Sequence, residues 1–273
     1  MAITTLDGYL ASAKQDLVMV KTQTATSVAA QPHTLWDRSG NPGAGSLAVG
    51  NTANGLVPTD ATTGAPLITN FAGGARGYIS NIEFGATVAG RIMLYDRLFH
   101  VGSINLNSLA TTTLASQPSF STRVALNGGA ASYVGLRIYL EINAAVSATA
   151  TTVTVTYTNQ SGTTGRTTGA TASLSGFITG RLVELPLQAG DSGVQTIESI
   201  IVGGVVATTG TVNVFIARPL WSGRVRVAND GDVHGFTQCG LAEVFQDSCL
   251  ALISTPDSTS TGIPDVRIEI ASG

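Results

Sequence analysis

The feature that most constrains the fold is a run of strictly alternating residues at positions 151–158, TTVTVTYT. Val153, Val155 and Tyr157 fall on one face of an extended chain, and threonines occupy the other face. Because successive side chains of a strand point to opposite faces, this pattern predicts a strand that is buried on one side. The Asn-Gln-Ser-Gly that follows at residues 159–162 is typical of a turn.

Similar short runs recur after residue 77, and Gly, Pro, Asn or Ser residues separate them. They include YISNIEF, GRIMLYDRLFHVGSI, SYVGLRIYLEINAAV, GRLVELPL, TIESIIVGGVV, TVNVFIARPL and DVRIEIA. Many short strands joined by turns, with almost no helix, indicate an all-β antiparallel sandwich. About ten strands divided between two sheets favour a jelly-roll-like arrangement.

The N-terminal part of the chain differs in composition, so we expect two regions. Residues 1–76 are predicted to form a short helix and an extended loop-rich arm, and residues 77–273 the sandwich domain. Four residues recur at roughly helical spacing near the start: Leu6, Leu10, Ala13 and Leu17. Thr5 or Asp7 would cap this helix. Residues 39–76 are dense in Gly, Pro, Asn and Thr, which is typical of a long binding loop, and we expect them to reach onto a neighbouring subunit.

Charge is scarce in this sequence. Charged residues make up 11% of the chain, against roughly 25% in ordinary soluble domains, so hydroxyl-bearing and small residues must cover the surface. Such a surface suits a protein that packs against other molecules. Lys14 and Lys21 are the only lysines. The arginine that replaces lysine elsewhere is favoured in interfaces, although a GC-rich coding genome produces the same bias.

The same numbers exclude several functions. A net charge of −3 without a basic cluster argues against nucleic-acid binding. The longest apolar runs, such as IIVGGVV at residues 200–206, are far shorter than the roughly 20 residues of a membrane helix. The N-terminus lacks the basic and apolar regions of a signal peptide, so we expect synthesis in the cytoplasm and, in consequence, reduced and buried thiols at Cys239 and Cys249.

The tetrapeptide GDSG at residues 190–193 is similar to the nucleophile motif of chymotrypsin-like proteases. That mechanism needs a histidine beside the serine and an aspartate that orients the histidine. The usual continuation is replaced by Val194 and Gln195, and neither His33 nor His100 lies in the family's histidine context. We therefore interpret the motif as a tight turn between two strands.

Two other polar clusters are candidate sites. Asp230, Asp232 and His234 would share one face of a strand and could hold a metal ion, but we favour a solvated turn with Asx caps over a metal site. One further cluster could form a carbohydrate platform, or could anchor the fold through its tryptophan: His33, Trp36, Asp37 and Arg38. Asp96 and Arg97 are expected to form a local ion pair.

Glycoside hydrolysis needs two carboxylates that flank one site. The candidate glutamates are instead spread singly over predicted strands: Glu83, Glu141, Glu184 and Glu198. The glycines follow no phosphate-binding pattern. We therefore predict no catalytic residue, no cofactor and no metal ligand, and a protein that is not an enzyme.

Several phrases resemble a group of tailed-bacteriophage virion proteins of similar length. They are MAITTLDGYLA, LWDRSGNPGAG, LYDRLFHVG, TVTYTNQSGTTGRTT and LPLQAGDSG, and in that group they occur in the same order. The resemblance covers most of the chain and implies a structural component of the virion, associated with the head. It marks no catalytic residue.

The expected function is that of a capsid decoration (cement) or minor capsid protein. Its expected partners are the major capsid protein and copies of itself in a homo-oligomer, for which a trimer would suit local threefold positions. The alternative is a tail-associated or receptor-binding protein, with Trp36 or Trp221 exposed for contact with host glycans.

Overall fold

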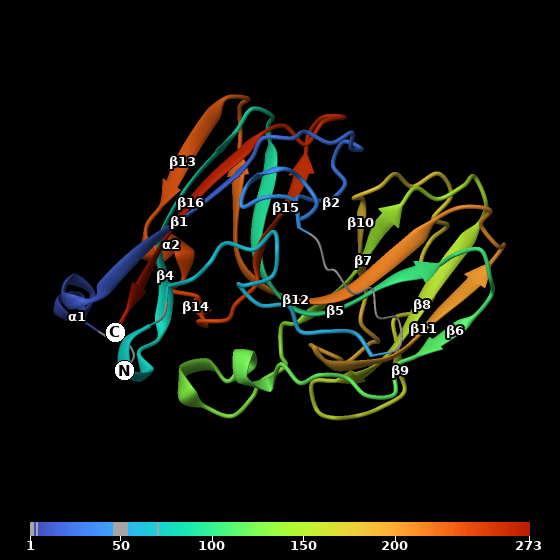
Figure 1. Cartoon of the computed structure of the whole chain (residues 1–273), viewed down its shortest axis with the longest axis horizontal. Helices are drawn as coiled ribbons and strands as arrows, with labels where there is room; N and C mark the ends of the chain where they lie inside the picture. Colours follow the sequence, from blue (N-terminus) through green and yellow to red (C-terminus); the bar gives the residue numbers. More distant parts are fainter. Residues whose placement is uncertain (1–2, 4, 46–53, 70) are drawn as a thin grey trace.

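The computed structural model describes residues 3, 5–45, 54–69 and 71–273. Its strands form three sheets in which every pairing is antiparallel, with two short helices at the periphery (Figure 1). The predicted all-β antiparallel sandwich is confirmed, and the structure adds a third sheet to the two expected. No helix in the described part of the chain is long and apolar enough to cross a membrane.

The first sheet has the order β13 (Asp230–His234), β4 (Gly77–Ala86), β16 (Pro264–Ser272), β1 (Ala13–Lys21) and β3 (Gly40–Asn41), and β14 (Glu243–Val244) also pairs with β4. The central sheet has the order β10 (Leu182–Leu185), β7 (Arg137–Ala144), β12 (Thr211–Val225), β5 (Gly90–Asn105), β15 (Leu250–Pro256) and β2 (His33–Thr34). The third sheet has the order β6 (Thr111–Thr113), β11 (Val194–Gly204), β8 (Thr151–Asn159) and β9 (Arg166–Thr167).

The long strands β5 and β12 join two halves of the molecule. They pair along almost their whole length, and the register shifts at three places, between Val212 and Val214, Ile216 and Ala217, and Pro219 and Trp221. Such irregularities bend a strand and increase its twist. Figure 1 shows the pair running from the half that holds β4 and β16 into the half that holds β8 and β11.

Each half has its own apolar core. Between the first and central sheets lie residues such as Ile82, Leu94 and Ile268, and between the central and third sheets lie residues such as Leu140 and Val155. A third cluster covers the opposite face of the central sheet, where the rings of Tyr95, Phe215 and Tyr139 stack at centroid distances of 5.5 and 5.3 Å: Trp36, Tyr95, Tyr139, Leu182, Phe215, Ala217, Cys249, Ala251 and Ile253.

The N-terminal helix is shorter than expected. α1 spans Leu6–Ala11, and Thr5 caps it by accepting a hydrogen bond from the backbone N–H of Gly8 at 3.0 Å. Ala13 and Leu17, which the spacing placed in this helix, belong to β1 instead. Leu17 is buried against the first core, and pairing with β16 satisfies the backbone, so sheet contacts override the weak helical pattern.

The loop-rich segment folds back on its own chain where it is described. Leu56 forms an isolated bridge with His100, and the side chain of Ile68 is buried in the core between the first and central sheets. The ammonium of Lys21 donates to the carbonyls of Pro42 and Gly43 at 2.9 and 3.2 Å. Part of the predicted arm, residues 46–53 and 70, lies outside the described residues.

Strands on the N-terminal side of residue 76 belong to the same sheets as strands that follow it. β1 is an inner strand of the first sheet, while β2 and β3 extend two sheets at their edges. Pairing with strands from the C-terminal end of the chain therefore places β1 in the first sheet and β2 in the central sheet. The remaining short helices are α2 (Phe236–Cys239) and the 3-10 turns η1 (Ala72–Gly74), η2 (Ser121–Val124) and η3 (Leu126–Gly128).

Candidate functional site

Two adjacent residues of β5, Asp96 and Arg97, place charge inside the protein where the strand bends. Both are fully buried. They do not pair with each other as expected, because neighbouring side chains of a strand point to opposite faces. Asp96 instead forms an ion pair with Arg123, and Arg97 forms one with Glu141. The two pairs therefore lie on opposite faces of the central sheet.

The network around Asp96 ties together segments that are distant in sequence. Its carboxylate accepts hydrogen bonds from the hydroxyl of Ser248 and the backbone N–H of Cys249, both at 2.9 Å. Arg123 also donates to the carbonyl of Arg97 at 3.0 Å. Every charged partner here is bonded within the protein, as a buried charge requires, so the arrangement is structural.

The network around Arg97 lies on the other face. The guanidinium donates to Glu141 Oε2 at 2.8 Å and to His100 Nδ1 at 2.9 Å. Asn213 donates to the same Glu141 oxygen at 3.0 Å. The guanidinium carbon of Arg97 lies 4.1 Å from the centre of the Phe215 ring, so a cation–π contact supplements these bonds.

These contacts fix the charge state of the network. Burial opposes ionisation of Glu141, but the attraction of Arg97 and the hydrogen bonds from Arg97 and Asn213 prevail and lower the pKa of Glu141 to about 2. Burial and the positive charge of Arg97 lower the pKa of His100 to about 3. Because an arginine can only donate, His100 Nδ1 must be an unprotonated acceptor, and the neutral ring carries its hydrogen on Nε2.

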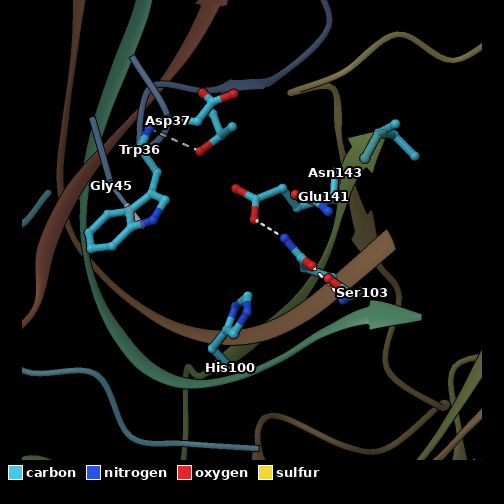
Figure 2. A pocket seen from close by; sticks show the side chains of 10 residues that line it. Trp36, Asp37, Gly45, His100, Ser103, Glu141 and Asn143 are labelled. Atoms are coloured by element: carbon cyan, nitrogen blue, oxygen red, sulfur yellow. Dashed lines mark hydrogen bonds between the residues drawn. The ribbon is translucent and has the colours of Figure 1, made fainter. Parts of the chain in front are cut away.

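This network forms part of the wall of a cavity of about 200 Å³. The cavity is lined by Thr34, Trp36, Asp37, Gly45, His100, Ser103, Glu141, Ile142, Asn143 and Asn213. Figure 2 shows Trp36, Asp37 and Gly45 on one side, with Glu141, Asn143 and Ser103 facing them and His100 below. We call it the Glu141 cavity.

The GDSG motif lies in the connection between β10 and β11, within a hydrogen-bonded turn. Asp191 accepts hydrogen bonds from the Tyr157 hydroxyl at 2.7 Å, the Asn159 amide at 2.7 Å and the Arg166 guanidinium at 2.8 Å. The backbone N–H of Ser192 donates to the side chain of Gln160 at 3.0 Å. Among the described residues, no histidine hydrogen-bonds to Ser192, so the motif lacks the base that a protease needs.

The three polar residues of β13 have local roles. Asp230 and Asp232 each accept a hydrogen bond from the backbone N–H of the following residue. His234 Nδ1 accepts from Trp221 Nε1 at 2.9 Å, and both rings contact the ring of Phe84. Within the described chain, no group of three His, Cys, Asp or Glu side chains is placed to hold a metal ion.

The residues considered as a carbohydrate platform are arranged differently from that hypothesis. His33 and Trp36 are buried, at 1% and 4% exposure, so neither ring offers an open surface. Asp37 and Arg38 form an ion pair with each other. Trp36 and Asp37 nevertheless line the Glu141 cavity, which sequence reasoning did not find because Glu141 and Asn213 are more than 100 residues away from them.

The glutamates considered for glycoside hydrolysis and the two cysteines lie in separate places. Glu184 forms an exposed ion pair with Arg137, and Glu198 accepts a hydrogen bond from the Thr158 hydroxyl at 2.8 Å. Cys239 and Cys249 are free and buried, as expected. Burial raises their thiol pKa values to about 11 and about 12.

No protein family model and no curated protein matches this chain. A structure of infectious bursal disease virus, Gt strain, is 11% identical, with 96% of this chain and 81% of that chain covered and a TM-score of 0.18. The VP2 subviral particle of the same virus is also 11% identical, with 96% and 80% covered and a TM-score of 0.19. These scores are too low to establish a shared fold.

Proposed function

We propose that this chain is a non-enzymatic structural protein of a tailed-bacteriophage virion. Its role would be that of a decoration (cement) or minor capsid protein, which stabilises the head through contacts with the major capsid protein and with copies of itself. A cement protein binds only the assembled shell, so its binding free energy adds to the stability of that state by mass action. Many copies on one lattice make modest contacts additive through multivalency.

The observation that carries the proposal is an exposed apolar surface near the N-terminus, which we call the α1–α2 patch. Four large side chains form it, with exposures of 66%, 65%, 50% and 38%: Leu6, Leu10, Phe236 and Leu241. Leu6, Phe236 and Leu241 line a hollow of about 220 Å³ whose walls are mostly apolar, and Leu10 follows Leu6 by about one turn of α1. Exposed apolar patches of this kind mark interaction surfaces, since each costs free energy while it remains in water.

The helix α1 itself supports this reading. It has only six residues and none of them is buried in the chain. Its main attachments are a hydrogen bond from the Tyr9 hydroxyl to Glu269 at 2.8 Å and contact between the rings of Tyr9 and Phe236. A helix so short does not persist alone in water, and burial of its two leucines against a neighbouring subunit would stabilise it.

The surface chemistry of the chain agrees with a role in a lattice. Few charges are available to keep copies apart, because only 11% of the residues are charged. The four side chains of the α1–α2 patch are far fewer than the roughly 20–30 residues that each partner contributes to a stable interface of standard size. A contact of that size is weak in a single pair and effective when it is repeated over a symmetric shell.

The proposal is tested by co-sedimentation of the purified chain with expanded, empty capsids of the phage that encodes it, and with isolated tails. We expect saturable binding to capsids at many copies per particle. Leu10→Ser should reduce the bound copies at least tenfold, while Leu109→Ser, at another exposed leucine (58% exposed) outside the patch, should bind like the unmodified chain. Binding to tails alone would refute the proposal and favour the tail-associated alternative.

A further inference from the structure

We propose that the Glu141 cavity is a binding site for one neutral sugar ring, either free or at the end of a glycan chain. The inference is independent of the lattice role, because the cavity lies between β2, β5, β7 and β12 and shares no lining residue with the α1–α2 patch. It rests on the composition, hydrogen bonding, charge and shape of the cavity.

The floor of the cavity consists of polar side chains that are almost fully buried. Thr34, His100, Glu141 and Asn213 are 1%, 3%, 5% and 9% exposed. Ser103 and Asn143 also line the cavity and are exposed, so they mark its opening to solvent. Burial of polar groups costs free energy unless they are hydrogen-bonded, so a concentration of them around one cavity is typical of a site that binds a polar ligand.

The lining retains hydrogen-bonding capacity after its internal bonds are counted. His100 uses Nδ1 for Arg97, which leaves its Nε2–H as a donor. Thr34 accepts from the backbone of Trp36, which leaves its hydroxyl hydrogen, and Asn143 donates to Thr211, which leaves its amide oxygen. Donors and an acceptor around one space match hydroxyl groups, each of which donates and accepts.

Charge balance selects a neutral ligand. Glu141 is paired with Arg97 and Asp37 is paired with Arg38, so each carboxylate of the cavity has its own cation. The His100 ring is neutral. A charged ligand would lose its hydration in such a site without gaining a counter-charge. A neutral polyhydroxylated molecule would pay no such penalty.

The same pairing indicates binding without hydrolysis. A glycosidase needs one carboxylic acid that remains protonated until it transfers its proton to the leaving group. The pKa of Glu141 is lowered to about 2, so this group stays ionised at neutral pH and cannot donate a proton. Glu141 therefore serves as a hydrogen-bond acceptor that positions its neighbours.

Gly102, beside the lining residue Ser103, leaves room for two groups of the cavity wall. A Cβ at Gly102 would lie 2.4 Å from Asn213 Oδ1 and 2.7 Å from His100 Nε2, so any side chain there would displace both groups. The next residue, Ser103, has a φ of 60°, a conformation that costs free energy for a residue other than glycine, and its N–H donates to Asn213 Oδ1 at 2.9 Å. The volume of about 200 Å³ is below that of pockets for drug-sized ligands, which suits one sugar ring.

The experiment uses the two tryptophans of the chain as reporters. Trp36 lines the Glu141 cavity and Trp221 does not. The indole N–H signals of the full chain are followed by ¹H–¹⁵N NMR while the methyl glycosides of glucose, galactose, mannose and N-acetylglucosamine are added separately. We expect at least one sugar to shift the Trp36 signal saturably, with a dissociation constant in the millimolar range, while the Trp221 signal stays in place.

Variants then locate the site. Asn143→Ala should weaken binding at least fivefold, and Asn107→Ala, a matched change at an exposed asparagine after β5, should leave it unchanged. A trisaccharide that ends in the same ring should give the same Trp36 shift if a glycan end is bound, and none if only the free sugar enters. The proposal is overturned if none of the four sugars shifts Trp36 saturably, if Trp221 alone responds, or if Asn143→Ala binds as tightly as the unmodified chain.

Discussion

Replacement of Glu141 by glutamine tests the buried network at the bend of β5. The glutamine would keep the shape of the side chain and its contact with Asn213, but it would leave the guanidinium of Arg97 buried without a counter-charge. Arg97 is fully buried and its ion pair with Glu141 measures 2.8 Å. Removal of one partner from a buried pair costs about 3–5 kcal/mol, because the remaining charge keeps its desolvation penalty.

The pKa of Glu141 gives an independent magnitude. A decrease from 4.5 to about 2 corresponds to about 3 kcal/mol of preference for the ionised form in the folded state. Because the folded-state pKa is the lower one, this stabilisation is complete above about pH 4.5 and is lost as the pH falls toward 2. Glu141→Gln should therefore be less stable than the unmodified chain at pH 7. Its free energy of unfolding should also lack the decrease that protonation of Glu141 causes as the pH falls from about 4.5 to about 2.

The assay is thermal and urea unfolding, followed by circular dichroism between pH 2 and 7. A loss of about 3 kcal/mol is expected to lower the unfolding temperature by roughly 6–12 °C. Glu184→Gln is the control, since it makes the same change on the neighbouring strand β10, where the ion pair with Arg137 is about half exposed. Exposed pairs contribute about 0–1 kcal/mol, so this control should be nearly neutral.

A double variant separates the pair from its surroundings. Arg97→Met combined with Glu141→Leu removes both charges, and it should be more stable than Glu141→Gln alone, because no unpaired charge remains. The reasoning is refuted if Glu141→Gln is no less stable than Glu184→Gln, or if its acid unfolding follows that of the unmodified chain.

Three further outcomes are expected. Asp191→Ala should lower the unfolding temperature, because Asp191 binds three side chains of β8 and β9, whereas Ser192→Ala should leave it unchanged. An equal loss in both variants would contradict the structural role of the motif. Cys239 and Cys249 should resist Ellman's reagent at pH 8 until the protein unfolds, because their thiol pKa values are about 11 and about 12. Rapid labelling of both thiols in the folded chain would contradict this prediction. Trp221→Phe should cost about 1–2 kcal/mol in urea unfolding through the lost hydrogen bond to His234, and an unchanged midpoint would show that this bond contributes nothing.

Short sequence patterns predicted those elements that are determined by interactions between residues close in sequence. Alternation at residues 151–158 predicted the strand β8, and Thr5 was one of two residues expected to cap the first helix. Turn composition explained the GDSG motif. The pattern was insufficient at Ala13 and Leu17, because a short apolar period there fits a helix and a strand equally well, and only the pairing of β1 with β16 decides between them.

The sequence by itself determined the all-β class, the turns and the scarcity of charge, because these follow from alternation, turn-forming residues and composition, which act over a few residues. The tertiary structure decided the partners of Asp96 and Arg97 and the Glu141 cavity. Arg97 and Glu141 are 44 residues apart, and Glu141 and Asn213 are 72 apart, so no local pattern relates them. They meet because β7 and β5 both pair with β12, and the bend in that long strand pair brings one face of each strand to the same place.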